Sequence, residues 1–260
     1  MTKNPPSTCI VSSALSDIGL VRANNEDYWG EQPRLCLYVL ADGMGGHCAG
    51  EVAAKEAVCQ FLQTVERSLE TQQFESSHDN IKQVLKYAAR QANWIVYQKS
   101  LQMEKLRGMG TTLCATFFFE EGFAAILHVG DSRIYRLRGD TLEQITEDHS
   151  LVRNIIGSGN LDAAEGEMFS FRNLITRSIG NNARVNPSVS ICETFVGDVF
   201  LMCSDGLSDY VSKKDIQKLI SHSDTLEKAS TALVNKANDL GGQDNITVVL
   251  MKLEDSGFEE

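Results

Sequence analysis

The chain has 260 residues and a formal net charge of −11, from 24 basic and 35 acidic side chains. This length can bury a large core, and the acidic balance disfavours nucleic acid or an anionic membrane surface as the main partner. The longest apolar stretches are too short for a membrane span, so we expect no membrane insertion. The seven cysteines include no Cys-x-x-Cys pair and the start lacks a signal-peptide core, which together predict a reduced, cytoplasmic protein.

Short apolar runs predict strands, and apolar residues at three- and four-residue spacing predict helices. In chain order, we expect strands at 11–14 and 35–41, helices at 53–69 and 81–103, strands at 113–119, 123–129, 134–137 and 199–203, a helix that begins at a Ser212–Asp215 capping box, a helix at 226–240 that stops at Gly241–Gly242, and a strand at 246–253.

Strands, a helix pair, more strands and further helices predict an α+β fold in which helices lie outside layered sheets. No repeat or linker divides the chain, so we expect residues 1–260 to form one domain with a core of about 10–253. Residues 148–175 hold three glycines and little strand character. They predict a short helical excursion that acts as a mobile flap.

Four aspartates lie at the ends of apolar runs. Asp42, Asp131 and Asp205 follow such runs, and Asp244 comes just before one. In an antiparallel sheet the end of one strand lies beside the start of its neighbour, so these carboxylates can converge at one rim of the core. Converged carboxylates repel one another unless cations lie among them, which predicts a metal site.

Asp42 and Asp205 each precede a glycine, and Asp-Gly is also the commonest signal for a short hairpin turn. For either residue alone, the turn is at least as good an interpretation. Taken with Asp131 and Asp244, the metal site becomes the better one. Gly43 then has a use, because a residue without a side chain lets its backbone carbonyl approach a cation.

The ligand set is all oxygen, without histidine or cysteine at metal-ligand spacing. Oxygen ligands suit Mg²⁺ or Mn²⁺ and disfavour zinc or copper. The spacing does not match an EF-hand loop, which makes structural calcium less favoured.

A second acidic patch, at 16–30, contains Arg22, Glu26 and Asp27. A guanidinium can bind phosphate oxygens through two parallel hydrogen bonds, and here it would lie beside further metal-binding carboxylates. The alternative is an inconsequential surface ion pair between Arg22 and Glu26, and spacing alone favours that alternative.

Seven motifs occur in the order shown by the metal-dependent protein serine/threonine phosphatases of type 2C: RANNED, ADGMGGH, GMGTT (108–112), VGDSR, TEDHS, SDGLSD and GGQDN. The chain resembles this family, and its bacterial branch in particular, from about Ser13 to Val249. The resemblance implies a central antiparallel β-sandwich flanked by antiparallel helix pairs, in four layers αββα.

The resemblance also implies roles for individual residues. Asp42 matches the aspartate that bridges two metals, and Gly43 offers its carbonyl. Asp205 and Asp244 match ligands of the first metal, Glu26 matches a ligand of the second, and Asp27 is a nearby acid. Asp131, with Asp205, matches a third, weaker metal site of bacterial members. Arg22 matches the arginine that holds the substrate phosphate, and Asn245 is expected to orient a ligand.

The implied activity is hydrolysis of phosphoserine and phosphothreonine in proteins by water activated at a Mn²⁺ or Mg²⁺ centre of two or three ions. The implied partners are phosphorylated proteins and a eukaryote-like bacterial Ser/Thr kinase. Two features depart from the family. Met44 stands where some members carry a proton-donating histidine, and we interpret nearby His47 as structural. The segment 162–167 (DAAEGE) is acidic where relatives often carry proline and basic residues.

Other phosphatase chemistries lack their residues. No cysteine is followed six residues later by arginine, no two aspartates are two apart, and no Walker loop is present. Two alternatives remain open: a catalytically inactive family member that binds phosphoproteins, and a small-molecule phosphatase that uses the same site.

Overall fold

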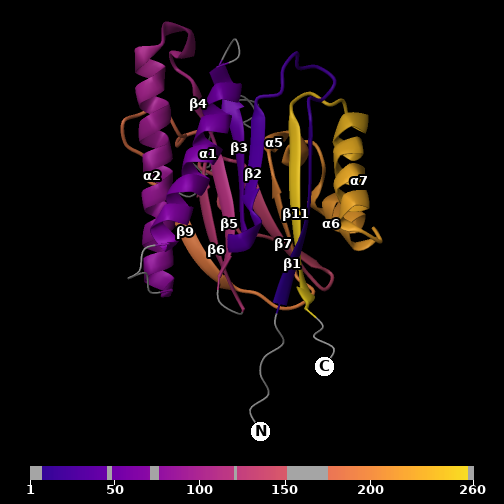
Figure 1. The fold of residues 1–260 in the computed structure, drawn as a ribbon. Coiled ribbons are helices and arrows are strands. Elements are labelled where there is room, and N and C mark those ends of the chain that lie inside the picture. Colours follow the sequence, from indigo (N-terminus) through magenta and orange to yellow (C-terminus); the bar gives the residue numbers. More distant parts are fainter. Residues whose placement is uncertain (1–7, 46–48, 71–75, 120–121, 151–174, 257–260) are drawn as a thin grey trace, which may run out of the picture.

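Two antiparallel sheets stack face to face with helices on both outer sides (Figure 1). The computed structural model describes residues 8–45, 49–70, 76–119, 122–150 and 175–256. The strands are β1 (Thr8–Asp17), β2 (Asp27–Gln32), β3 (Leu37–Met44), β4 (Gly110–Thr111), β5 (Leu113–Phe119), β6 (Phe123–Val129), β7 (Arg133–Arg138), β8 (Thr141–Gln144), β9 (Ser188–Glu193), β10 (Val199–Cys203) and β11 (Ile246–Asp255). The helices are α1 (Ala49–Leu69), α2 (His78–Gln102), α5 (Asp205–Ser208), α6 (Lys213–Ser221) and α7 (Leu226–Asp239), with 3₁₀ turns at Pro33–Leu35 and Glu104–Leu106.

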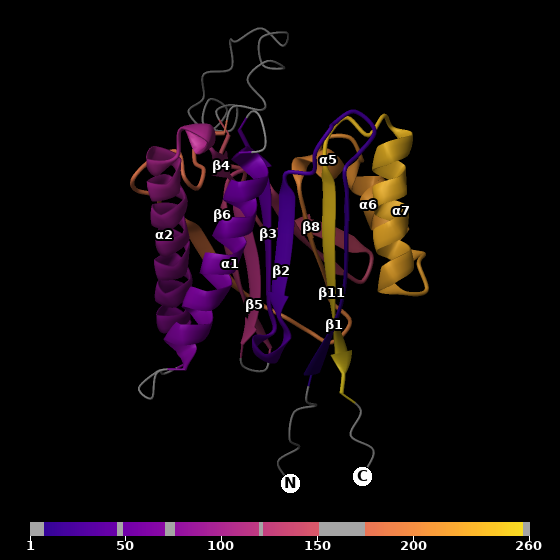
Figure 2. The same ribbon diagram turned by 45° about the horizontal axis from the view of Figure 1, so that its top comes forward.

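One sheet has the strand order β1-β11-β10-β7-β8, and the other has the order β2-β3-β5-β6-β9 with β4 paired to β3. Helices α1 and α2 pack together on the sheet that contains β2, β3 and β9. Helices α6 and α7 cover the sheet that contains β1, β11 and β8, so the molecule has four layers (Figure 2). The predicted α+β sandwich is confirmed.

Apolar side chains fill the three interfaces between the four layers of helices and sheets. Between the sheets lie Leu40, Ile126, Phe200 and Met202, among others. Leu201, between the last two, faces the α6–α7 side instead, because successive residues of a strand point to opposite faces. Since both faces of the central strands are buried, these strands have continuous apolar sequences.

The predicted strands agree best at the centre of each sheet. The ranges 113–119, 123–129 and 199–203 match β5, β6 and β10 at both ends. Strands β2, β8 and β9 were not predicted, and each lies at the edge of its sheet. Their sequences, DYWGEQ, TLEQ and SVSICE, contain few apolar residues because an edge strand buries less of its surface.

The helix signals also hold. The Ser212 Oγ accepts a hydrogen bond from the backbone N–H of Asp215 at 3.2 Å, so Ser212 caps α6 as predicted. The Asp215 carboxylate accepts from the Ser212 hydroxyl at 2.7 Å. Gly241 and Gly242 have φ angles of 121° and 49° after α7, so the helix stops where predicted. Of the expected flap, residues 151–174 lie outside the described residues, as does His47. No helix in the described ranges is long and apolar enough to cross a membrane.

Candidate metal centre

Two carboxylates, the buried Asp27 and the partly buried Asp42, face each other across the β2–β3 pair. The register places Asp27 directly opposite Asp42, where their like charges repel. The Oδ2 of Asp27 accepts a hydrogen bond from the Ser204 hydroxyl at 2.8 Å. Its buried Oδ1 has no hydrogen-bond partner among the described residues. An unsatisfied buried carboxylate oxygen is costly, and a cation is one way to satisfy it.

A second pair of carboxylates lies at the end of the β7–β10 pair. The last paired residues are Arg133 and Cys203, and Asp131 and Asp205 lie two residues beyond them at the same edge. The buried Oδ1 of Asp131 also has no partner within the described ranges. Asp205 is the first residue of α5, and Asp42 lies inside β3. The hairpin-turn alternative is therefore wrong for both Asp-Gly steps.

Burial raises the pKa values of all four carboxyl groups, and neighbouring carboxylates of the cluster add to the rise for Asp42 and Asp205. Burial raises the pKa of Asp42 well above its usual value, and the charges of Asp27, Asp205, Asp131 and Asp244 raise it further. Burial likewise raises the pKa of Asp205, reinforced first by Asp131. Burial raises the pKa of Asp27 and of Asp131 to about 6 in each case. The cluster therefore favours binding of positive charge.

Close backbone packing explains the glycine after Asp42. The N–H of Gly43 donates to the carbonyl oxygen of Glu26 at 3.1 Å. A methyl group at Gly43 would lie 2.5 Å from that oxygen and would also clash with the carbonyl of Gly50. The glycine thus brings Glu26 against β3 and the start of α1. Burial raises the pKa of Glu26, and the charge of Arg22 opposes that shift.

Arg22 forms its ion pair with a distant residue. Its Nη2 donates to Oδ2 of Asp244 at 2.6 Å, so the local pair with Glu26 is not the one that forms. Asn245 brings these segments together. Its Oδ1 accepts from the N–H of Glu26 at 2.8 Å, and its Nδ2 donates to the carbonyl oxygen of Asn24 at 2.9 Å. Asn245 therefore fixes the loop that carries Arg22 and Glu26 against the start of β11.

Two threonines hold the backbone of Asp42 and were not predicted as site residues. The Asp42 N–H donates to Oγ1 of Thr112 at 2.9 Å, and Thr111 Oγ1 donates to the Asp42 carbonyl at 2.8 Å. Thr112 Oγ1 also bonds to the Ser132 hydroxyl at 2.7 Å, beside Asp131. The GMGTT motif contains both threonines, but nothing local in it indicates that they support Asp42.

The donor set fits Mg²⁺ or Mn²⁺. No three His, Cys, Asp or Glu side chains in the described part of the chain are already arranged to hold an ion by themselves. Mg²⁺ commonly binds through one or two carboxylates and keeps several waters, so it needs no complete protein cage. The buried partnerless oxygens of Asp27 and Asp131 and the mutual repulsion of the carboxylates both fit hard divalent cations.

The chain is similar to known proteins over nearly its whole length. A family model described as Protein phosphatase 2C matches residues 21–246. The protein phosphatase PhpP of Streptococcus pneumoniae is 35% identical over 253 residues, which cover 95% of this chain and 99% of PhpP. The structure of an S. agalactiae serine/threonine phosphatase is 33% identical with a TM-score of 0.84, over 94% of this chain and all (100%) of that one. The catalytic domain of the phosphatase PstP, solved in complex with 2 manganese ions, is 34% identical with a TM-score of 0.80, over 96% of this chain and 100% of that one.

Proposed function

The chain belongs to the protein phosphatase 2C family, and on this premise we propose that it hydrolyses phosphoserine and phosphothreonine in proteins with Mn²⁺ or Mg²⁺ as cofactor. The observation that carries this proposal is the meeting of two carboxylate pairs, Asp27–Asp42 and Asp131–Asp205, at the ends of paired strands. Like charges held this close at buried and partly buried positions destabilise a fold unless a cation compensates them.

We assign the ligands as follows. Asp42, the carbonyl of Gly43, Asp205 and Asp244 would hold a first ion, and Asp42 and Glu26 would hold a second, with Asp27 as a nearby acid. Asp131 and Asp205 would hold an accessory third ion. The buried Oδ1 of Asp131, which has no partner among the described residues, supports its place as a ligand. The negative charges of Asp205, Asp131 and Asp244, which raise the pKa of Asp42, support a shared cation site around Asp42.

When bound, such ions neutralise the phosphate dianion and lower the pKa of water toward neutrality. The protein supplies the positioning. Arg22 would bind the equatorial phosphate oxygens as their charge shifts, and its ion pair with Asp244 places the guanidinium beside the acidic cluster. Asn245 holds the loop that carries Arg22. Met44 has no proton to donate, so the leaving alkoxide takes its proton from water at the site.

The direct test is release of phosphate from a phosphothreonine peptide with added Mn²⁺. We expect turnover that EDTA abolishes and that added Mn²⁺ restores; full activity in EDTA would overturn the proposal. A kcat/KM for a sugar phosphate equal to that for the peptide would favour the small-molecule alternative. A rate for the wild type as low as that of Asp205→Asn with para-nitrophenyl phosphate would favour an inactive binding protein.

We further propose that the chain forms one domain, in a cytoplasmic protein that opposes a eukaryote-like bacterial Ser/Thr kinase. Its likeness to bacterial serine/threonine phosphatases over nearly the whole chain supports this setting. A comparison of phosphoproteins in a deletion strain and its parent tests it. We expect phosphoserine and phosphothreonine to accumulate in the targets of such a kinase, and an unchanged phosphoproteome would count against the pairing.

A further inference from the structure

Arg133 occupies the point where the strands that carry Asp131 and Asp205 converge. It is the first residue of β7, two residues after Asp131, and it pairs in register with Cys203, two residues before Asp205. Its backbone is therefore fixed beside both carboxylates. Arg133 belongs to the VGDSR motif, yet nothing in the proposed reaction so far uses its side chain.

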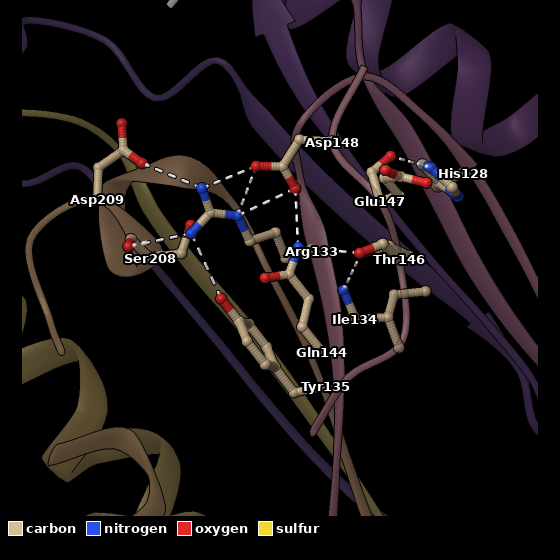
Figure 3. Close-up of polar contacts among 10 residues, drawn as sticks. All are labelled: His128, Arg133, Ile134, Tyr135, Gln144, Thr146, Glu147, Asp148, Ser208 and Asp209. Atoms are coloured by element: carbon tan, nitrogen blue, oxygen red, sulfur yellow. Dashed lines mark hydrogen bonds and ion pairs between the residues drawn. The ribbon is translucent and has the colours of Figure 1, made fainter. Parts of the chain in front are cut away.

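The guanidinium of Arg133 connects its own strand, β7, to the segment that carries Asp148 and to α5 (Figure 3). Its Nε donates to Oδ2 of Asp148 at 3.0 Å, and its Nη2 lies 2.9 Å from the same oxygen. Its Nη1 donates to the carbonyl oxygen of Ser208, in the last turn of α5, at 3.3 Å. Because Asp205 begins that four-residue helix, the last contact ties Arg133 to the element that presents Asp205.

Arg133 lies between two acids, the nearly buried side chain of Asp148 and the exposed side chain of Asp209. The Asp148 side chain is only 9% exposed, and Asp209 lies 3.7 Å from Nη2 of Arg133. Gln144 adds a hydrogen bond to Asp148 at 2.9 Å, which orients this carboxylate toward the guanidinium. The planar guanidinium of arginine can donate hydrogen bonds to a carboxylate and to a carbonyl oxygen at the same time, in fixed directions. The single ammonium group of lysine cannot reproduce this arrangement of donors.

We propose that Arg133 is a positioning residue of the reaction: its fork locks the turn that carries Asp131 to the helix that carries Asp205, so that the two carboxylates can share one divalent cation. This inference rests on the proposed function, since it takes Asp131 and Asp205 as ligands. Arg133 contacts neither substrate nor cation in this role. It acts as the outer partners of metal ligands do, by fixing where the ligands lie.

The competing explanation is an ordinary structural ion pair, and the same strand provides a matched control. Arg138, five residues further along β7, forms a two-contact pair with Asp198, from Nε to Oδ1 at 2.7 Å and from Nη2 to Oδ2 at 2.6 Å. Asp198 is 1% exposed, so this pair is at least as buried as Arg133–Asp148 on the acid side. It lies at the opposite end of β7 from the metal centre.

The experiment measures Mn²⁺ binding to full-length wild type, Arg133→Lys, Arg133→Met and Arg138→Met by electron paramagnetic resonance of free Mn²⁺, with thermal unfolding of each protein. We expect the dissociation constant of the most weakly bound Mn²⁺ ion to rise about 10-fold in both Arg133 variants. Arg138→Met should lower the unfolding temperature and leave Mn²⁺ binding unchanged. Phosphopeptide turnover against Mn²⁺ concentration should shift in parallel for the Arg133 variants.

Two results would overturn the inference. Folded Arg133 variants that bind Mn²⁺ as the wild type does would reduce Arg133 to a structural ion pair. Tighter binding by Arg133→Met, with Arg133→Lys unchanged, would show that Arg133 acts only by repelling the cation. If Arg133→Met does not fold, Arg133→Lys keeps the charge and decides the outcome. A wild type that binds Mn²⁺ but hydrolyses no phosphopeptide would refute the proposed function. The role of Arg133 would then be decided by the Mn²⁺ affinities of the variants alone.

Discussion

The buried carboxyl group of Asp131 links the stability of the metal-free protein to pH. Burial raises its pKa from 3.8 to about 6 in the folded state. The folded protein therefore holds this proton more tightly than the unfolded chain does. The resulting stabilisation is present below pH 4 and is lost as the pH rises through 6.

Asp131→Asn should therefore stabilise the metal-free protein at pH 7.5, by about 1–3 kcal/mol, because a neutral amide replaces a buried charge. The gain over wild type should shrink toward pH 4, where the wild-type carboxyl is protonated. Urea unfolding at several pH values measures both quantities. Asp140→Asn, at an exposed position, is the control and should change stability little at any pH. A destabilised Asp131→Asn at pH 7.5 would show that this carboxylate is satisfied without a cation.

Replacing Arg22 tests the contribution of a second single residue. Arg22→Ala should lower kcat for a phosphopeptide by about 10²–10³, because one donor to the phosphate oxygens is lost. The exposed Arg34, at the other end of β2, provides the control, and Arg34→Ala should leave kcat unchanged. Steady-state kinetics at saturating Mn²⁺ checks both variants. Equal losses, or no loss in either, would remove Arg22 from the phosphate site.

The ion pair of Arg22 also shows where sequence reasoning stops. Spacing favours a local pair with Glu26, but the partner, Asp244, is 222 residues away. The register of β1 against β11 and the hydrogen bonds of Asn245 bring these segments together. The identity of the acids was predictable from the motifs. Their supports, Thr112, Ser204 and Arg133, act through tertiary contacts that leave no local pattern.

At the scale of secondary structure, the close packing of β3 against α1 and against the loop that carries Glu26 depends on Gly43. Gly43→Ala should cost about 3 kcal/mol or more, because its methyl group would meet backbone carbonyls that cannot move independently. Gly139, in the β7–β8 hairpin, has φ of 53° and open space around its Cβ position. Gly139→Ala should cost only about 1 kcal/mol. Chemical denaturation compares the two, and equal costs would show that packing at Gly43 is loose.

The elements differ in how well the sequence predicts them, and burial explains the difference. Strands β5, β6 and β10 are covered on both faces, so their apolar runs define both ends. Edge strands β2, β8 and β9 carry polar residues, and their pairing is decided by the neighbouring strand. The family resemblance indicated Asp27 as a nearby acid, but because β2 was not predicted, its place opposite Asp42 in a sheet could not be predicted.

At the scale of the whole molecule, metal binding should raise the free energy of unfolding. The chain has a net charge of −11, and several of its acids meet at one end of the sandwich. Mn²⁺ at 100 times its dissociation constant should stabilise the folded state by about 2.7 kcal/mol per site. Thermal unfolding with and without Mn²⁺ measures this, and EDTA should reverse the rise. An unfolding temperature that Mn²⁺ leaves unchanged would contradict a folded-state metal site.

The central claim is that the carboxylates at the ends of β3 and β10 bind the cations that make phosphate transfer to water possible. Its most direct test is phosphate release from a phosphothreonine peptide by wild type and Asp205→Asn at saturating Mn²⁺, after both proteins are shown to be folded. We predict turnover by the wild type and a loss of at least about 10²-fold in Asp205→Asn. Equal rates for the two proteins would contradict the claim.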